Sequence, residues 1–205
     1  MFAIDRSRGL LFHDGRAYAP GTRTWEAVPL PSSAEPADPV QALAWLQRES
    51  GHPMKAPIGI IGPNEATKEQ VAVSAEVGAI VGRMGLAVLC GGRQGVMEGA
   101  SRGTASVGGL TIGLLPHCDP SQANPFVTVA IASGIGEARN AIIAQASSCL
   151  IAVGDSHGTL SEVALGLRLG KRVFGLAGAA QVDGVMHLAS TEELPAALAQ
   201  ELLKF

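Results

Sequence analysis

The sequence predicts an α/β fold in which a doubly wound, mostly parallel sheet carries helices on both faces. From residue 57 onward, short apolar runs alternate with segments of helical pattern, which is typical of parallel strands joined by crossover helices. The apolar runs are continuous instead of alternating with polar residues, as expected for strands that are buried on both faces. Glycine-rich turns follow three of the runs, at the end where such sheets bind ligands.

Residues 1–56 are expected to form a small N-terminal extension made of a hairpin, a connector and a helix. Asp14-Gly15 stands between two strand-like runs, which indicates a hairpin turn. The connector, residues 29–39, is rich in proline and serine. Asp38 followed by Pro39 predicts a helix start. The extension either covers apolar surface of the main domain or closes over a pocket.

Residues 57–205 are expected to form a Rossmann-like nucleotide- or phosphate-binding domain. Thr67 is the expected N-cap of its first helix. The expected strands are 57–62, 86–92, 109–116, 126–133, 149–154 and 172–178, and the expected helices are 67–85, 95–106, 136–147, 159–170 and 191–205. The helix at 71–85 has Ala, Val and Gly on most faces and needs burial nearly all round, so a homodimer or higher homo-oligomer is expected.

Composition sets aside several classes of protein. The net charge is −3 and Lys and Arg form no cluster, so nucleic acid is not an expected partner. No apolar run approaches the ~20 residues of a membrane span and no signal segment opens the chain, so a cytoplasmic protein without membrane contact is expected. The three cysteines, Cys90, Cys118 and Cys149, have no Cys-x-x-Cys spacing, and neither a disulfide framework nor a metal site is expected.

The candidate site consists of three glycine-rich corners at strand ends, which are residues 62–64, 91–95 and 154–158. Glycine lets the backbone approach a ligand closely, and a helix N-terminus offers free N–H groups to an anion. A phosphorylated small molecule is therefore the expected partner. The candidate binding residues are Gly62, Asn64, Gly91, Gly92, Arg93, Gly95, Met97, Asp155, Ser156, His157, Gly158 and Thr159.

Other chemistries fit the motifs less well. Residues 154–158, Gly-Asp-Ser-His-Gly, match the nucleophile elbow of serine hydrolases. Only Asp183 and His187, four positions apart, follow Ser156 as acid and base, so Ser156 is expected to line or cap a ligand site and not to attack. The turn at residues 91–99 is not Gly-x-Gly-x-x-Gly and lacks the acidic residue that holds a ribose, and a P-loop pattern is absent.

Residues 91–103, GGRQGVMEGASRG, and 154–162, GDSHGTLSE, resemble the two-part signature of the "lysine decarboxylase-like" family. That family includes cytokinin riboside 5′-monophosphate phosphoribohydrolases and molybdenum-cofactor carrier proteins, and it is similar to the Rossmann-like domain of DNA-processing protein A. The resemblance covers about residues 57–177. It implies a Rossmann-like fold, whereas no pyridoxal-lysine context supports a lysine decarboxylase.

The resemblance also assigns residues. Gly91, Gly92, Gly95 and Met97 match the first turn, and the end of the second motif matches at Gly158, Thr159 and Glu162. Arg139 matches the arginine near the ligand in the hydrolases, where it and the glutamate are implied to break the base–ribose bond, which makes Arg139 and Glu162 the candidate catalytic pair.

One departure from the family matters, because its Pro-Gly-Gly becomes Gly154-Asp155-Ser156. A carboxylate at Asp155 repels a nearby phosphate unless it points away, binds a metal together with the ligand, or selects a less charged ligand.

Two residues carry open alternatives. Thr159-x-x-Glu162 is also a capping box, so Glu162 either caps a helix or acts as a carboxylate that stabilises a ribosyl cation or moves a proton. Arg139 lies near a helix start, where a cation is unfavourable. It is either an ordinary surface arginine or the partner of Glu162, Asp155 or a ligand phosphate.

Two functions follow. The first is binding or carriage of a nucleotide-like or pterin-type phosphorylated ligand, such as a nucleoside monophosphate or a molybdopterin-type cofactor, and the altered Pro-Gly-Gly favours it. The alternative is hydrolysis of the N-glycosyl bond of a nucleoside 5′-monophosphate, which releases free base and ribose 5-phosphate, and the retained Arg139 and Glu162 favour that. Both require the corners at 91–95 and 154–158 to share one hollow.

Overall fold

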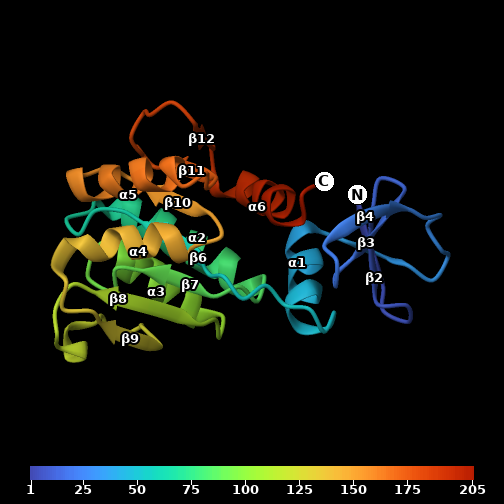
Figure 1. Ribbon diagram of the computed structural model, residues 1–205, viewed down its shortest axis with the longest axis horizontal. Coiled ribbons are helices and arrows are strands. Elements are labelled where there is room, and N and C mark those ends of the chain that lie inside the picture. The colour runs from blue at the N-terminus through green and yellow to red at the C-terminus, as the bar shows by residue number, and fades with distance from the viewer. The chain divides into compact units, whose positions relative to one another are not determined.

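The computed structural model describes residues 1–205, which divide into two compact units. Unit 1 comprises residues 1–55 and 195–205, and unit 2 comprises residues 56–194 (Figure 1). The sequence-based boundary placed 195–205 with the Rossmann-like domain, but this segment groups with the N-terminal residues. The reason is packing within unit 1, where Trp25 Nε1 donates a hydrogen bond to the carbonyl of Leu203 at 2.7 Å.

Unit 1 contains an antiparallel sheet with the strand order β4-β3-β2-β1-β5. The expected hairpin is β2–β3, and its turn residues Asp14 and Gly15 have φ values of 47° and 73°. Three further strands were not expected, and one of them includes Pro36 of the connector, at the sheet edge where a missing N–H is tolerated. The strands are β1 Phe2–Asp5, β2 Leu10–His13, β3 Arg16–Ala19, β4 Thr24–Ala27 and β5 Glu35–Ala37.

Helix α1, Pro39–Arg48, begins where the sequence predicts. The Asp38 carboxylate accepts from the Gln41 amide at 2.8 Å, and the Gln41 side chain accepts from the Asp38 amide at 2.8 Å. This reciprocal capping satisfies two backbone N–H groups that the first turn leaves free. The helix α6, Leu194–Leu203, follows the short helix η3, Thr191–Glu193.

Unit 2 is built on a seven-stranded parallel sheet with the order β12-β11-β10-β6-β7-β8-β9 (Figure 1). The chain starts at the central β6, runs outward to β9, and returns to β10 on the other side of β6. The order of the strands therefore reverses between β6 and β10, which makes the Rossmann-like, doubly wound prediction correct. The strands are β6 Ile58–Ile61, β7 Val88–Cys90, β8 Thr111–Leu115, β9 Val129–Ala132, β10 Leu150–Val153, β11 Val173–Leu176 and the unexpected β12 Val185–His187.

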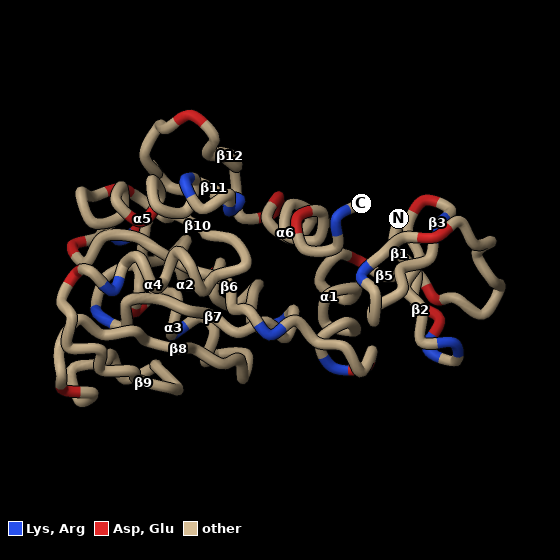
Figure 2. Tube along the Cα trace, viewed as in Figure 1, with Lys and Arg blue, Asp and Glu red and all other residues tan.

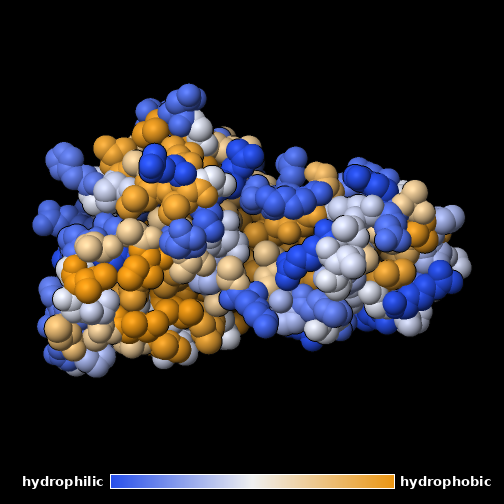
Figure 3. Space-filling model, in the orientation of Figure 1, coloured by the Kyte–Doolittle hydropathy of each residue, from blue (hydrophilic) through white to orange (hydrophobic).

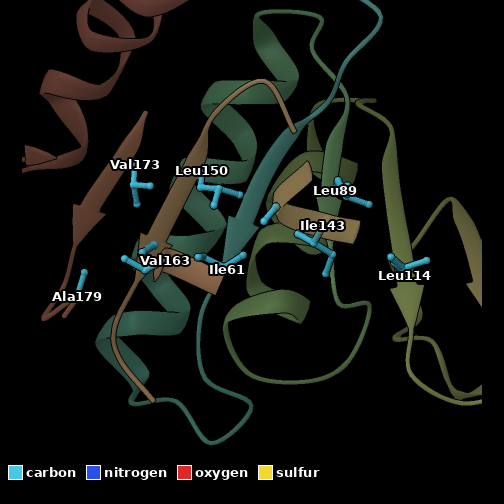
Figure 4. Packing of buried hydrophobic residues seen from close by; sticks show 10 residues of the cluster. Ile61, Leu89, Leu114, Ile143, Leu150, Val163, Val173 and Ala179 are labelled. Carbon is cyan, nitrogen blue, oxygen red and sulfur yellow. The ribbon is translucent and has the colours of Figure 1, made fainter. Parts of the chain in front are cut away.

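Two pairs of helices cover the sheet of unit 2, one on each face (Figure 1). Helices α4, Arg139–Ala146, and α5, His157–Arg168, lie on one face, and side chains such as Ile143 and Val163 pack against Leu150 and Ile61 of the strands (Figure 4). Each such buried aliphatic side chain contributes roughly 1.5–3 kcal/mol. This part of the core therefore lies under α4 and α5 and helps to fix where both helices begin.

The other face carries α2, Lys68–Arg83, and α3, Val96–Ser106, which pack closely. A Cβ at Gly78 would overlap the carbonyl of Ala100, and one at Gly103 would overlap the carbonyl of Ala75. The small residues of α2 thus serve contacts inside the chain. The homo-oligomer therefore stays a prediction, and the small residues of α2 no longer support it.

Lys and Arg are interspersed with Asp and Glu along the trace of each unit (Figure 2). None of the helices combines the length and the apolar character needed to cross a membrane.

Candidate functional site

A cavity of about 480 Å³ lies at the carboxyl ends of β6, β7 and β10, beside the point where strand order reverses. All three glycine-rich corners contribute to it, so the corners at 91–95 and 154–158 share one hollow, as both candidate functions require. The lining residues are Ile60, Ile61, Gly62, Asn64, Gly91, Arg93, Met97, Glu137, Arg139, Asn140, Ser156, His157, Gly158, Thr159, Ser161 and Glu162.

Helix α5 opens on this cavity, and Ser156 is its N-cap. The Ser156 hydroxyl accepts from the Thr159 amide at 3.1 Å and lies 2.9 Å from the Thr159 hydroxyl. The first N–H groups of a helix have no partner within the helix, and with the helix dipole they favour an anion. Ser156 thus both caps α5 and lines the cavity, while neither Asp183 nor His187 reaches it. The nucleophile-elbow pattern does not assemble a catalytic triad here.

Arg139 and Glu162 meet in the wall of the cavity. Arg139 is the first residue of α4, and its Nη1 lies 3.4 Å from Glu162 Oε1 on α5. Only 5% of the arginine side chain and 8% of the glutamate side chain are exposed. The Asn140 side-chain oxygen also accepts from Arg139 Nη1. Of the alternatives for Arg139, a surface position is wrong and Glu162 is its partner.

The capping interpretation of Glu162 is wrong. Because Ser156 caps α5, Glu162 falls in the second turn, beyond the position from which a side chain reaches back to the N-cap. Its side chain lines the cavity instead. The Thr159-x-x-Glu162 spacing matches a capping box only because the helix start was placed three residues too late, at Thr159.

Burial raises the pKa of Glu162 to about 8, since desolvation of the carboxylate outweighs the lowering effect of Arg139, and Glu137 raises the pKa further. At pH 7 the carboxyl is therefore mostly protonated, so Glu162 itself does little to compensate the charge of Arg139. The Nε of Arg139 is buried and has no hydrogen-bond partner. The guanidinium also lines the cavity, where a charged donor group favours an anion.

Gly91 lies directly against this arginine. A Cβ at Gly91 would stand 2.6 Å from Arg139 Nη2 and 2.7 Å from the sulfur of Met97. Those separations are far below van der Waals contact, so a side chain at residue 91 would push the guanidinium from its place. The glycine of the first motif therefore makes room for Arg139, and Met97 packs beside it.

Three of the predicted site residues lie outside the cavity. Gly92 packs on Gly113, and Gly95 has a φ of 64° at the start of α3, where a Cβ would overlap the carbonyl of Pro63. These two glycines shape the turn and do not line the hollow. Asp155 is exposed and is not among the lining residues, so its carboxylate does not stand in the cavity opposite a bound anion.

The sequence interpretation missed Glu137, which links two arginines at the cavity. Its Oε1 lies 3.3 Å from Arg93 Nη1, and its Oε2 lies 3.7 Å from Arg139 Nη2. The signal was available, because an acidic residue two positions before a buried arginine can fold back onto it. Asn140 and Ser161 were also missed, and Asn140 Nδ2 donates to Ser161 Oγ at 3.4 Å.

The cavity offers no metal ligands in a group, since nowhere in the chain do three His, Cys, Asp or Glu side chains gather closely enough to hold an ion. Its polar lining includes backbone amides, hydroxyls and guanidinium groups, which bind anions, together with the carboxyl groups of Glu137 and Glu162.

Fold and cavity together define a Rossmann-like protein with a cavity at the switch point of its sheet. The chain belongs to the SLOG cluster4 family, whose model matches residues 55–201. The resemblance to the lysine decarboxylase-like proteins that the two glycine motifs predicted is thereby confirmed.

Two solved structures of molybdenum-cofactor proteins are similar to this chain. One is the molybdenum cofactor binding protein of Rippkaea orientalis, with 34% identity and a TM-score of 0.68, covering 73% of this chain and 99% of that protein. The other is the molybdenum cofactor carrier protein of Chlamydomonas reinhardtii, with 34% identity and a TM-score of 0.67, covering 74% of this chain and 100% of that protein. An uncharacterized protein of Archaeoglobus fulgidus is 38% identical over 136 residues, which is 66% of this chain and 89% of that protein.

Proposed function

We propose that this protein binds a phosphorylated small molecule of the nucleotide or pterin type in the cavity, and that it serves as a carrier akin to the molybdenum cofactor carrier proteins. The observation that carries the proposal is that Arg139 and the N-terminus of α5 line the same cavity. The similarity to two molybdenum-cofactor proteins over nearly their whole lengths supports the choice of ligand.

The residues of the cavity suit such a ligand. A volume of about 480 Å³ falls in the range of roughly 300–1,000 Å³ typical of small-molecule sites. The amides at the start of α5 and the hydroxyls of Ser156 and Thr159 would hold the anionic group, and Arg139 would neutralise its charge. A protonated Glu162 would donate a hydrogen bond instead of repelling the ligand. In this role the protein binds and orients its cargo and breaks no bond.

The test is to denature the purified protein and analyse any released molecule for phosphate and, after oxidation, for pterin fluorescence. We expect a phosphorylated pterin or nucleotide to come off the wild type and to be largely lost from Arg139→Ala. Arg168→Ala, at the exposed C-terminal end of α5, is the matched control and should retain the ligand. A wild type that carries nothing and cannot be loaded with molybdopterin or nucleoside monophosphates would contradict the proposal.

A second function, hydrolysis of a nucleoside 5′-monophosphate, is favoured by one observation, the pKa of about 8 at Glu162 beside Arg139. A carboxyl that is protonated at pH 7 can give its proton to a departing base while water attacks the ribose carbon of the broken C–N bond. Free base released from a panel of nucleoside monophosphates, and abolished in Glu162→Gln, would establish the hydrolase. Binding without release of base would leave the carrier function.

A further inference from the structure

A second cavity of about 380 Å³ adjoins the first and shares Asn64 and Arg93 with it. We infer that this second cavity receives a planar heterocycle with a 2-amino-4-oxo edge, as found in guanine and in pterins, while the first cavity receives the anionic group of the same ligand. The inference rests on the proposed function and names the ligand class that the site selects.

The boundary between the two cavities is held from both sides. The Gln94 amide donates to Asn64 Oδ1 at 3.3 Å, and Asn124 Nδ2 donates to the Arg93 carbonyl at 2.8 Å. Asn124 is itself buried. The backbone at residues 93–94 is thereby fixed between two asparagines, while the Arg93 guanidinium reaches Glu137 in the first cavity. A ligand that extends from one cavity into the other would therefore contact a rigid stretch of backbone at residues 93–94.

Glu98 supplies the selective chemistry of the second cavity. It is half-buried in the first turn of α3, lines the cavity, and has no hydrogen-bond or ion-pair partner within the chain. An ionised carboxylate only accepts, and its two oxygens suit two parallel N–H donors. The 2-amino group and adjacent ring N–H of guanine or a pterin present such a pair. Adenine has an unprotonated ring nitrogen at the corresponding edge, which would face the carboxylate as a second acceptor.

The remaining side chains of the second cavity complete a polar surround. Gln94 and Gln122 carry amides that both donate and accept, and His117 offers an imidazole ring. Such groups match the oxo group and ring nitrogens of a heterocycle, which alternate between accepting and donating.

The experiment compares the binding of guanosine 5′-monophosphate, adenosine 5′-monophosphate and inorganic phosphate to the full chain by calorimetry. We expect the guanine nucleotide to bind about tenfold or more tightly than the adenine nucleotide. Glu98→Gln should remove that preference without weakening the binding of phosphate. Glu76→Gln, an exposed glutamate on α2, is the matched control and should keep the preference.

The outcomes separate this inference from the proposed function. Equal affinity for the two nucleotides, or a preference for adenine, overturns the inference and leaves anion binding intact. An equal loss of all three ligands in Glu98→Gln also overturns it, because that pattern indicates a structural role for the carboxylate at the start of α3. Absence of binding by all three ligands to the wild type, together with failure to load molybdopterin, contradicts the proposed function itself.

Discussion

The Arg139–Glu162 pair behaves as it does because both side chains are buried. In water the two groups would form an ordinary ion pair of small net value. In the cavity wall, loss of hydration raises the pKa of Glu162 to about 8 despite the nearby guanidinium. The pair therefore presents a cation and a neutral acid at pH 7, an arrangement suited to an incoming anion.

This pKa predicts how stability depends on pH. Between about 4.5, the ordinary value, and about 8, the folded state holds a proton on Glu162 that the unfolded state has lost. Stability therefore falls as pH rises through this window, by up to ~1.4 kcal/mol per pH unit from this group. Glu162→Gln should flatten the dependence and be the more stable form near pH 8, as urea unfolding at pH 6, 7, 8 and 9 would measure.

The matched control for that series is Glu76→Gln, whose side chain is exposed on α2. It should follow the wild-type curve at every pH. Parallel curves for wild type and Glu162→Gln would show that the pKa of Glu162 is close to its ordinary value in the folded protein.

Glu137 is expected to compete with the ligand. Its carboxylate lies 3.3 Å from Arg93 and 3.7 Å from Arg139, so it neutralises part of the positive charge that would otherwise attract an anion. Glu137→Gln should bind inorganic phosphate several-fold more tightly, and more so at low salt, because a like charge has been removed. Calorimetric titration with phosphate measures this, with exposed Glu192→Gln as the control. Weaker binding would mean that Glu137 positions the arginines.

Among the elements, α5 links fold to site most directly. Its start is set by Ser156, while its buried face packs through Val163 into the core. Because Ser156 fixes the start of α5 and Val163 anchors its buried face, the N–H groups of its first turn are held at the cavity. α4 is placed by the same core through Ile143, which is why Arg139 and Glu162 meet.

Two substitutions at Ser156 separate its capping role from its place in the site. Ser156→Ala should lower the free energy of unfolding by about 1 kcal/mol, because an N-cap hydrogen bond is lost. Ser156→Asp should retain the cap and the stability but weaken phosphate binding, because its carboxylate would stand beside the anion. Chemical denaturation and calorimetry on the same samples measure the two effects. Equal phosphate affinity in wild type and Ser156→Asp would place the anion away from the start of α5.

At the scale of the whole molecule, a hydrophobic surface remains uncovered on unit 2. Apolar side chains gather over and beside α4 (Figure 3), and a hollow of about 420 Å³ there is lined by Ala141, Ile142, Gln145, Ala146, Leu165 and Leu169. Ile142 is 44% exposed and Leu169 is 41% exposed. Exposed apolar patches of this kind commonly mark protein contacts. The expected homo-oligomer is thus better motivated by α4 and α5 than by α2.

The oligomer prediction is tested by changing this surface. We expect the wild type to sediment as a dimer or larger assembly, and the double variant Ile142→Asp with Leu169→Asp to sediment as a monomer with unchanged secondary structure. Leu110→Asp, at an exposed leucine just before β8, is the control and should leave the assembly intact. A monomeric wild type at micromolar concentration would contradict the prediction.

The sequence by itself determined the order of the elements in unit 2 apart from β12, the N-caps at Asp38 and Thr67, and the glycine corners at the strand ends. These features depend on residues within a few positions of one another, so local patterns suffice to predict them. Unit 1 was harder, because its short strands lack a strong pattern and its helix α6 comes from the far end of the chain. Trp25 and Leu203, joined by a hydrogen bond, are 178 positions apart.

Only the tertiary structure decided what the corners do together. Arg139 and Glu162 are 23 positions apart, and Arg93 and Glu137 are 44 apart, yet each pair meets at the same cavity. The protonation of Glu162 follows from burial, which the whole packed core creates. Local propensity places a residue on a helix or at a turn, but the free energy of its charge depends on every neighbour that excludes water from it.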